Sequence, residues 1–102
     1  MLGNMYFNGA DVKRDLEKAA IYVSKAAENN IREALLMYGV MNKDGLGLEV
    51  DNETALGSFD KAARLGDPEA LCYISEFYAK GIVVEKDMER AEGYYNKGVE
   101  YK

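Results

Sequence analysis

The chain has little of what disulfide bonds, zinc sites and membrane helices require. Its 102 residues include one cysteine (Cys72), one proline and no histidine. A single cysteine excludes a disulfide within the chain, and zinc is rarely held by one thiolate and carboxylates alone. There is no run of 18 apolar residues, and the N-terminus lacks the basic start and apolar core of a signal peptide. We therefore expect no metal, no cofactor and no transmembrane helix, and a reducing compartment such as the cytoplasm is favoured.

Positive charge is also in short supply. The formal net charge is −5, and the imbalance grows along the chain. Residues 1–30 hold four basic and four acidic groups, residues 31–66 hold four and six, and residues 67–102 hold five and eight. Because phosphate binding needs a basic face, this balance argues against DNA or RNA as the main partner. It argues equally against binding to an anionic membrane surface.

A repeat of 36 residues runs through the whole chain. The residues that recur at this spacing are Asp15, Asp51 and Asp87; Ala19, Ala55 and Ala91; Lys25, Lys61 and Lys97; and Gly9, Gly45 and Gly81. A fixed period of this length is typical of stacked helical pairs, which present surfaces rather than reaction centres. The sequence therefore predicts one all-α domain, an α-solenoid of three helix-turn-helix repeats. We place these repeats at about 1–30, 31–66 and 67–102, with the first and last incomplete or uncapped.

The third repeat carries the clearest helix signals. Asp67-Pro68 is a helix start, with Asp as the N-cap and Pro at the first helical position. Apolar residues follow at spacings of three and four as far as Gly81, the expected left-handed stop. Asp87 should cap a second helix, whose predicted buried face is Ala91, Tyr94, Tyr95 and Val99. The same signals predict helices at about 1–8, 15–29, 31–43 and 51–65, with loops at 9–14 and 44–50.

Small residues recur where two helix axes should approach closely. They include Gly3 and Gly39, which lie inside predicted helices although glycine there is less favourable than alanine by about 1 kcal/mol. A larger side chain at such a contact would overpack it, at a cost of about 1–3 kcal/mol.

Each repeat follows the pattern Leu-Gly-x-x-Tyr-x-x-Gly, an aliphatic loop residue, Asp-x-x-x-Ala, and an aromatic residue followed by Lys-Ala-Ala. In the first copy these positions are Leu2-Gly3-Asn4-Met5-Tyr6-Phe7-Asn8-Gly9, then Val12, Asp15, Ala19, Tyr22, Val23 and Lys25-Ala26-Ala27. The pattern resembles the Sel-one-like repeat (SLR) family, which is related to tetratricopeptide (TPR) repeats. The resemblance implies a superhelix whose concave face binds other proteins, in adaptors, scaffolds and regulators rather than enzymes.

Three positions depart from this pattern. Asn42 stands where the other two copies have Tyr6 and Tyr78, Ser75 replaces the glycine, and Gly98-Val99 replaces Ala-Ala. We expect the middle and last turns to pack less regularly as a result.

One motif invites a catalytic interpretation. Ser58 and Lys61 form a Ser-x-x-Lys sequence, which pairs a nucleophile with a base in β-lactamases. The partner motifs Ser-Asp-Asn and Lys-Thr-Gly are absent, and Lys61 belongs to the repeat. We therefore predict that the protein is not an enzyme and keep a β-lactam-related enzyme only as an alternative. The acidic loop from Asp44 to Asp51 lacks the ligand spacing of a calcium loop, so we interpret it as a helix connector with Asp51 as an N-cap.

Apolar pairs four residues apart recur on the first helix of each repeat. They are Met1 and Met5, Met37 and Met41, and Tyr73 and Phe77. This spacing places each pair on one helix face, and the repeat stacks the pairs side by side. One interpretation is a methionine-rich groove for a partner, and the alternative is inter-repeat core, which is favoured for Met5, Met41 and Phe77. The candidate partner-binding residues are Met37, Val40, Met41, Tyr73, Glu76, Phe77 and Lys80.

The sequence thus predicts a protein-protein interaction module that binds another protein or peptide. A dedicated regulator or inhibitor of one cognate protein is the alternative within binding. A clamp for a terminal carboxylate is not expected, because only Asn4, Lys43 and Lys80 are offered. Solenoids normally end in repeats with polar outer faces. Neither end of this chain has one, so we expect either a longer array or self-association through an end, with part of the last helix exposed.

Overall fold

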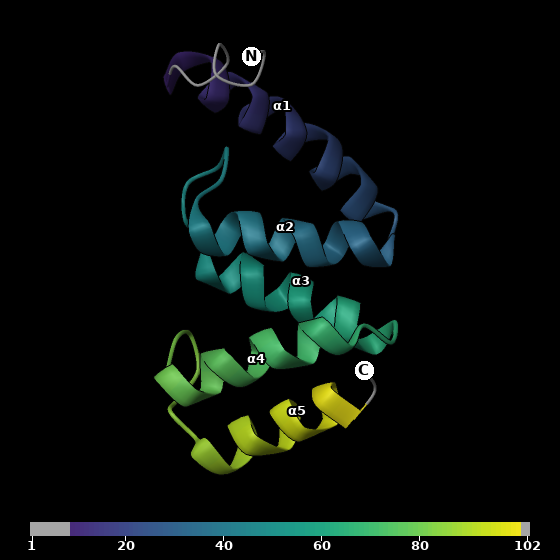
Figure 1. Ribbon diagram of the computed structural model, residues 1–102, viewed down its shortest axis with the longest axis vertical. Coiled ribbons are helices and arrows are strands. Elements are labelled where there is room, and N and C mark those ends of the chain that lie inside the picture. Colours follow the sequence, from purple (N-terminus) through teal and green to yellow (C-terminus); the bar gives the residue numbers. More distant parts are fainter. Residues whose placement is uncertain (1–8, 101–102) are drawn as a thin grey trace, which may run out of the picture.

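The chain folds into a stack of helices. The computed structural model describes residues 9–100, and side-chain environments from residue 14 onward. The helices are α1 (Gly9–Glu28), α2 (Arg32–Asp44), α3 (Asn52–Arg64), α4 (Pro68–Lys80) and α5 (Met88–Glu100). Each packs against the next one along the chain, so that the stack runs from α1 to α5 (Figure 1). The prediction of an all-α solenoid is confirmed, and the predicted helix at 1–8 lies outside the described residues.

Aspartates begin the helices where the repeat predicts them. Asp51 accepts a hydrogen bond from the Thr54 N–H at 3.0 Å, and Asp87 accepts one from the Arg90 N–H at 3.1 Å. Asp67 accepts from the N–H groups of Glu69 and Ala70 at 2.9 and 3.4 Å. These carboxylates satisfy backbone donors that the first turn of a helix leaves unpaired. The predicted N-caps are therefore confirmed at α3, α4 and α5.

Glycines end α2 and α4. Gly45 and Gly81 adopt left-handed φ angles of 72° and 69°, and their N–H groups bond to the carbonyls of Met41 and Phe77. A side chain at such a φ would be strained, which is why glycine recurs here in the repeat.

The predicted loop at 9–14 is wrong. This segment is the beginning of α1, which runs without a break from Gly9 to Glu28. The later loops contain further left-handed residues, Gly47 at φ 75° and Val83 at φ 69°. Residues 10–14 contain no glycine that would favour a left-handed turn directly after Gly9.

The core lies where α3 meets α4. Phe59 and Phe77 are fully buried, and their rings meet edge to face with centroids 6.0 Å apart. Alanines at repeat positions surround them: Ala55, Ala62 and Ala70 are fully buried. Small side chains bring the helix axes close enough for the two rings to fill the space between them.

The predicted buried face of α5 is only partly correct. Ala91 and Gly98 are buried, and Tyr94 is half-buried with its ring stacked on Tyr78 at 5.5 Å. Tyr95 and Val99 are exposed, at 53% and 43%. These two side chains are therefore not part of the core, and the buried face of α5 is narrower than its apolar pattern indicates.

The departures from the repeat pattern do not loosen the packing. Ser75 is buried, and its hydroxyl donates a 2.6 Å hydrogen bond to the Ala91 carbonyl, which ties α4 to α5. Asn42 is also buried, and its side-chain amide donates to the Tyr38 carbonyl at 2.8 Å. A Cβ on Gly98 would lie 2.8 Å from Cys72 Sγ, so glycine permits a closer approach of α5 to α4. The expected irregular packing is therefore wrong at these positions.

Candidate partner-binding face

The candidate site lies on α2 and α4, two helices that α3 separates in the sequence. We define the α2–α4 face by Met37, Val40 and Lys43 on α2 and by Tyr73, Glu76 and Lys80 on α4. Spacings of three and four residues put each group on one side of its helix. Met37 and Tyr73 occupy the same position in successive repeats, 36 residues apart. Met37 is 53% exposed, and Tyr73 is half-buried.

A charged cluster joins α2 to α4 across this face. The Lys43 Nζ atom lies 3.0 Å from Asp44 Oδ1 and 3.9 Å from Glu76 Oε1. The Lys80 Nζ atom lies 3.8 Å from the same Glu76 oxygen. The hydrogen bond to Asp44, and then the charges of Asp44 and Glu76, raise the pKa of Lys43 above its usual value. Both lysines of this face therefore already pair with carboxylates of the chain itself. Neither lysine is free to bind the terminal carboxylate of a partner peptide.

The Tyr73 ring is held in place by contacts with Phe59 and Lys43. Its ring stacks on Phe59 with centroids 4.5 Å apart and an angle of 8° between the planes. The Lys43 ammonium lies 5.8 Å from the Tyr73 ring centroid, within the range of a cation–π contact. A tyrosine fixed on both sides loses little conformational entropy when a partner packs against its free edge, and such residues anchor protein interfaces.

Two of the predicted binding residues do not reach this surface. Met41 and Phe77 are 5% and 0% exposed. Their position fits the alternative interpretation of inter-repeat core, because each is the inward member of its four-residue pair. Val40 is partly buried against the same core. The structure therefore brings Met37, Tyr73, Glu76 and Lys80 to the accessible part of the face, and Met5 lies outside the described residues.

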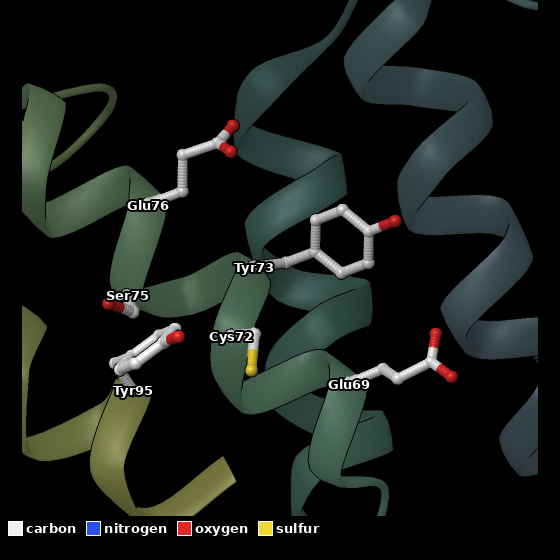
Figure 2. A pocket seen from close by; sticks show the side chains of 6 residues that line it. All are labelled: Glu69, Cys72, Tyr73, Ser75, Glu76 and Tyr95. Atoms are coloured by element: carbon white, nitrogen blue, oxygen red, sulfur yellow. The ribbon is translucent and has the colours of Figure 1, made fainter. Parts of the chain in front are cut away.

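A pocket at the edge of the face was not foreseen. It has a volume of about 430 Å³ and is lined by Glu69, Cys72, Tyr73, Ser75, Glu76 and Tyr95. Figure 2 shows Glu69, Tyr73 and Glu76 projecting from α4, with Tyr95 reaching toward Ser75 from α5. The spacing from Glu69 to Tyr73 to Glu76 is four and then three residues, a helical stripe that the sequence contains. The contribution of Tyr95 follows only from the packing of α5 against α4.

Comparison with protein families agrees with this repeat architecture. The Sel1 repeat model matches at residues 1–31, 32–67 and 68–100. The chain belongs to the Sel1 repeat family. Comparison with curated proteins gives no match.

Solved structures of Sel1 repeats are similar to this chain. A Sel1 repeat protein from Oxalobacter formigenes superposes with a TM-score of 0.81 at 30% identity, covering 84% of this chain and 25% of its own. A protective antigen of uropathogenic Escherichia coli that displays an SLR fold gives 0.81 at 32% identity, covering 97% and 21%. This chain therefore spans a quarter or less of the length of either protein. Sel1 repeats generally serve as protein-interaction modules.

The Ser-x-x-Lys motif is an ordinary position of these Sel1 repeats. Ser58 is 7% exposed, Lys61 is exposed, and no hydrogen bond joins them in the part of the chain that the structure describes. A nucleophile needs a base within hydrogen-bond reach and access to substrate. The geometry of Ser58 and Lys61 meets neither condition.

The acidic loop of the second Sel1 repeat is a helix connector. Asp51 caps α3, and Asp44 pairs with Lys43, so both ends of the loop have local partners. Among residues 14–100, whose side chains the structure describes, no three His, Cys, Asp or Glu side chains gather as a metal-binding group. None of the helices within residues 9–100 is long and apolar enough to cross a membrane.

Proposed function

We propose that this chain binds a partner protein or peptide through the α2–α4 face, as an adaptor or scaffold. The observation that carries the proposal is the repeat-related pair of Met37 and Tyr73. Met37 is exposed, and the Tyr73 ring is fixed by its stack on Phe59. Methionine adapts to irregular partner surfaces, and a preorganised aromatic ring supplies a rigid anchor.

The charges around this pair support a protein partner. Lys43, Glu76 and Lys80 form a mixed-sign cluster next to Tyr73. A rim with both signs orients a partner and excludes partners with the wrong charge pattern. It does not provide the excess of positive charge that a phosphate backbone requires.

The proposal is tested by capture of partners with a matched pair of variants. The immobilised chain and its Met37→Glu variant are incubated with a lysate of the source organism, and bound proteins are quantified by mass spectrometry. Ile21→Glu is the control, because Ile21 is similarly exposed (56%) but lies on α1. Circular dichroism establishes that all three chains remain helical.

The expected result is a protein that is retained by the wild type and by Ile21→Glu and is lost with Met37→Glu. An unchanged set of bound proteins in the Met37→Glu sample would overturn the proposal. Met37→Glu is expected to leave the core intact, because the Met37 side chain is 53% exposed.

A further inference from the structure

A second groove lies between α3 and α5, on a different side of α4 from the α2–α4 face. Its volume is about 560 Å³, within the range of about 300–1,000 Å³ that is usual for ligand pockets. We define the α3–α5 groove by the residues that line it, which are Glu53, Leu56, Gly57 and Asp60 on α3, Ile74 and Tyr78 on α4, Val83 in the loop that follows α4, and Tyr94 on α5.

This groove does not depend on where the array of repeats ends. The helices that form it, α3, α4 and α5, are all described, and the preceding helices α1 and α2 leave it open. An equivalent groove lies one repeat earlier, where Glu17 and Ile21 correspond to Glu53 and Gly57. That earlier groove is open although a further repeat, α4 and α5, follows it. A repeat stacked after α5 would therefore leave the α3–α5 groove open in the same way.

The loop after α4 gives the α3–α5 groove its depth. In the earlier groove the position of Val83 is occupied by Gly47, on which a Cβ would collide with the Leu16 carbonyl. That loop therefore lies against α1, and the described lining of the earlier groove comes from α1 and the loop alone. Val83 has the same left-handed backbone, at φ 69°, but carries a side chain that is 50% exposed. A side chain prevents so close an approach, and the groove reaches the buried Ile74 on α4.

The lining combines aromatic rings with carboxylates. Tyr78 and Tyr94 stack with their ring centroids 5.5 Å apart. Glu53 and Asp60 supply the charge, and no lysine or arginine is among the described residues that line the groove. The Arg90 guanidinium, which lies outside the lining, is 5.8 Å from the Tyr78 ring centroid, so the aromatic pair already attracts a cation. The groove therefore suits a ligand that is positively charged and has apolar parts between its charges.

The two carboxylates are accessible to such a ligand. Glu53 is exposed and makes no ion pair within residues 14–100. Asp60 lies 3.0 Å from Arg64, but both side chains are largely exposed, at 48% and 77%. Exposed pairs of this kind contribute at most about 1 kcal/mol, so a ligand cation can replace Arg64 at little cost.

The spacing of the carboxylates indicates the shape of the ligand. Glu53 and Asp60 are seven residues apart on α3, which is about 10.5 Å along the helix axis. In a polyproline II segment, residues three apart lie on the same side and are separated by about 9.3 Å. Grooves lined by aromatic side chains commonly bind segments in this conformation.

We propose that the α3–α5 groove binds an extended segment of a partner protein with lysine or arginine at two positions three residues apart. The two cations pair with Glu53 and Asp60. The residues between them pack on the Tyr78–Tyr94 pair and on Val83. This is a second binding surface, and it does not rest on the function proposed for the α2–α4 face.

Three fluorescein-labelled peptides with blocked ends test the proposal against the whole chain. The first contains Lys-Pro-Leu-Lys, the second has the same composition with the two lysines adjacent, and the third has glutamate in place of both lysines. Binding is measured by fluorescence anisotropy. The first peptide is expected to bind at least about threefold more tightly than the second and about tenfold more tightly than the third, and the latter difference should shrink at high salt. Equal binding of the first peptide and either of the others would overturn the proposal.

A matched pair of variants locates the binding site. Gly57→Ile should weaken binding of the first peptide by about tenfold or more, because it fills the groove. No heavy atom lies within 4 Å of the Cβ that it adds, and isoleucine already occupies the equivalent position at Ile21. Gly93→Ile is the control, since it adds the same side chain at the equivalent open position of α5, outside the groove. Circular dichroism establishes that both variants are folded, and wild-type affinity in Gly57→Ile would refute the site.

Two further measurements separate this proposal from its rivals. If sedimentation shows a dimer that Gly57→Ile dissociates, the occupant is a second copy of the chain and the assignment to a partner segment is wrong. Met37→Glu should leave peptide binding unchanged, because Met37 does not line the groove. Peptide binding that is lost in Gly57→Ile and kept in Met37→Glu therefore supports the groove even if capture of partners through Met37 fails. Loss of peptide binding in Met37→Glu would instead place the peptide on the α2–α4 face.

Discussion

Gly39 lies directly against the ring of Phe59. A Cβ atom on Gly39 would sit 2.6 Å from Phe59 Cε1 and 2.8 Å from Cδ1 and Cζ. The ring cannot move aside easily, because Tyr73 stacks on it and Phe77 packs against its edge. Gly39 therefore sets the distance between α2 and α3, and Phe59 links that contact to α4.

Gly39→Ala should lower the free energy of unfolding. Overpacking a filled core typically costs about 1–3 kcal/mol, which exceeds the gain of about 0.5–1 kcal/mol from replacing a helical glycine by alanine. Urea unfolding followed by circular dichroism measures the change. Gly57→Ala is the control, because no heavy atom lies within 4 Å of the Cβ that it adds to α3. It should stabilise the protein by about 0.5–1 kcal/mol, and equal stabilisation by both substitutions would refute the role given to Gly39.

Ser75→Ala should weaken the contact between α4 and α5. The buried Ser75 hydroxyl donates to the Ala91 carbonyl at 2.6 Å, and its loss should reduce the free energy of unfolding by about 0.5–1.5 kcal/mol. Thermal and urea unfolding both report the change. Ser24→Ala, at a half-buried serine on α1, should change stability by less than about 0.5 kcal/mol. Similar small effects in the two variants would mean that the hydroxyl does not tie the helices together.

The sequence contains enough to place the helix ends and most of the core. N-cap residues such as Asp67 and helix-ending glycines such as Gly81 act on backbone groups close to them in sequence. They can therefore be recognised from the sequence alone. The period then assigns equivalent positions, which is how the small residue Gly39 could be placed at a close helix contact. The helix at 9–14 could not be found in this way, because the repeat locates a loop position but the local residues decide whether a loop forms.

The candidate site was less accessible to prediction than the fold. Helical spacing placed Met37 and Tyr73 on a surface, but burial of Met41 and Phe77 depends on how far each helix is rotated toward its neighbour. The contact from Lys43 to Glu76 joins two helices, and no pattern within either helix contains it. Tyr95 looks like a core residue by its repeat position, and only the absence of a described helix over it makes it a surface residue.

Asp67→Ala should destabilise α4. The Asp67 carboxylate accepts from two N–H groups of the first turn, and loss of an N-cap typically costs about 0.5–2 kcal/mol. Asp67→Asn keeps an acceptor and should lose much less. Urea unfolding of the two variants distinguishes capping from a general effect of mutating a buried position, since the latter would affect both alike.

Ile31→Asp should have the opposite effect at α2. Ile31 stands 36 residues before Asp67 and is the N-cap of α2, with extended φ and ψ of −77° and 119° but no side-chain cap hydrogen bond. Its backbone already suits a capping carboxylate, and its side chain is 47% exposed. The substitution should therefore raise the free energy of unfolding by about 0.5–1 kcal/mol. Ile31→Ala, which supplies no acceptor, is the matched control and should not stabilise the protein.

Asp51 should make stability depend on pH in the acid range. Hydrogen bonds from the Thr54 N–H and hydroxyl lower the pKa of this carboxyl below its usual value of 3.8. A group whose pKa is lower in the folded state stabilises the fold above its unfolded pKa, and that contribution disappears as pH falls through the folded pKa. Asp51→Asn should therefore be less stable than wild type at neutral pH, and the two should converge below pH 3.8. Urea unfolding of both proteins across this range measures the difference, and a gap that stays constant with pH would show that charge at Asp51 plays no part.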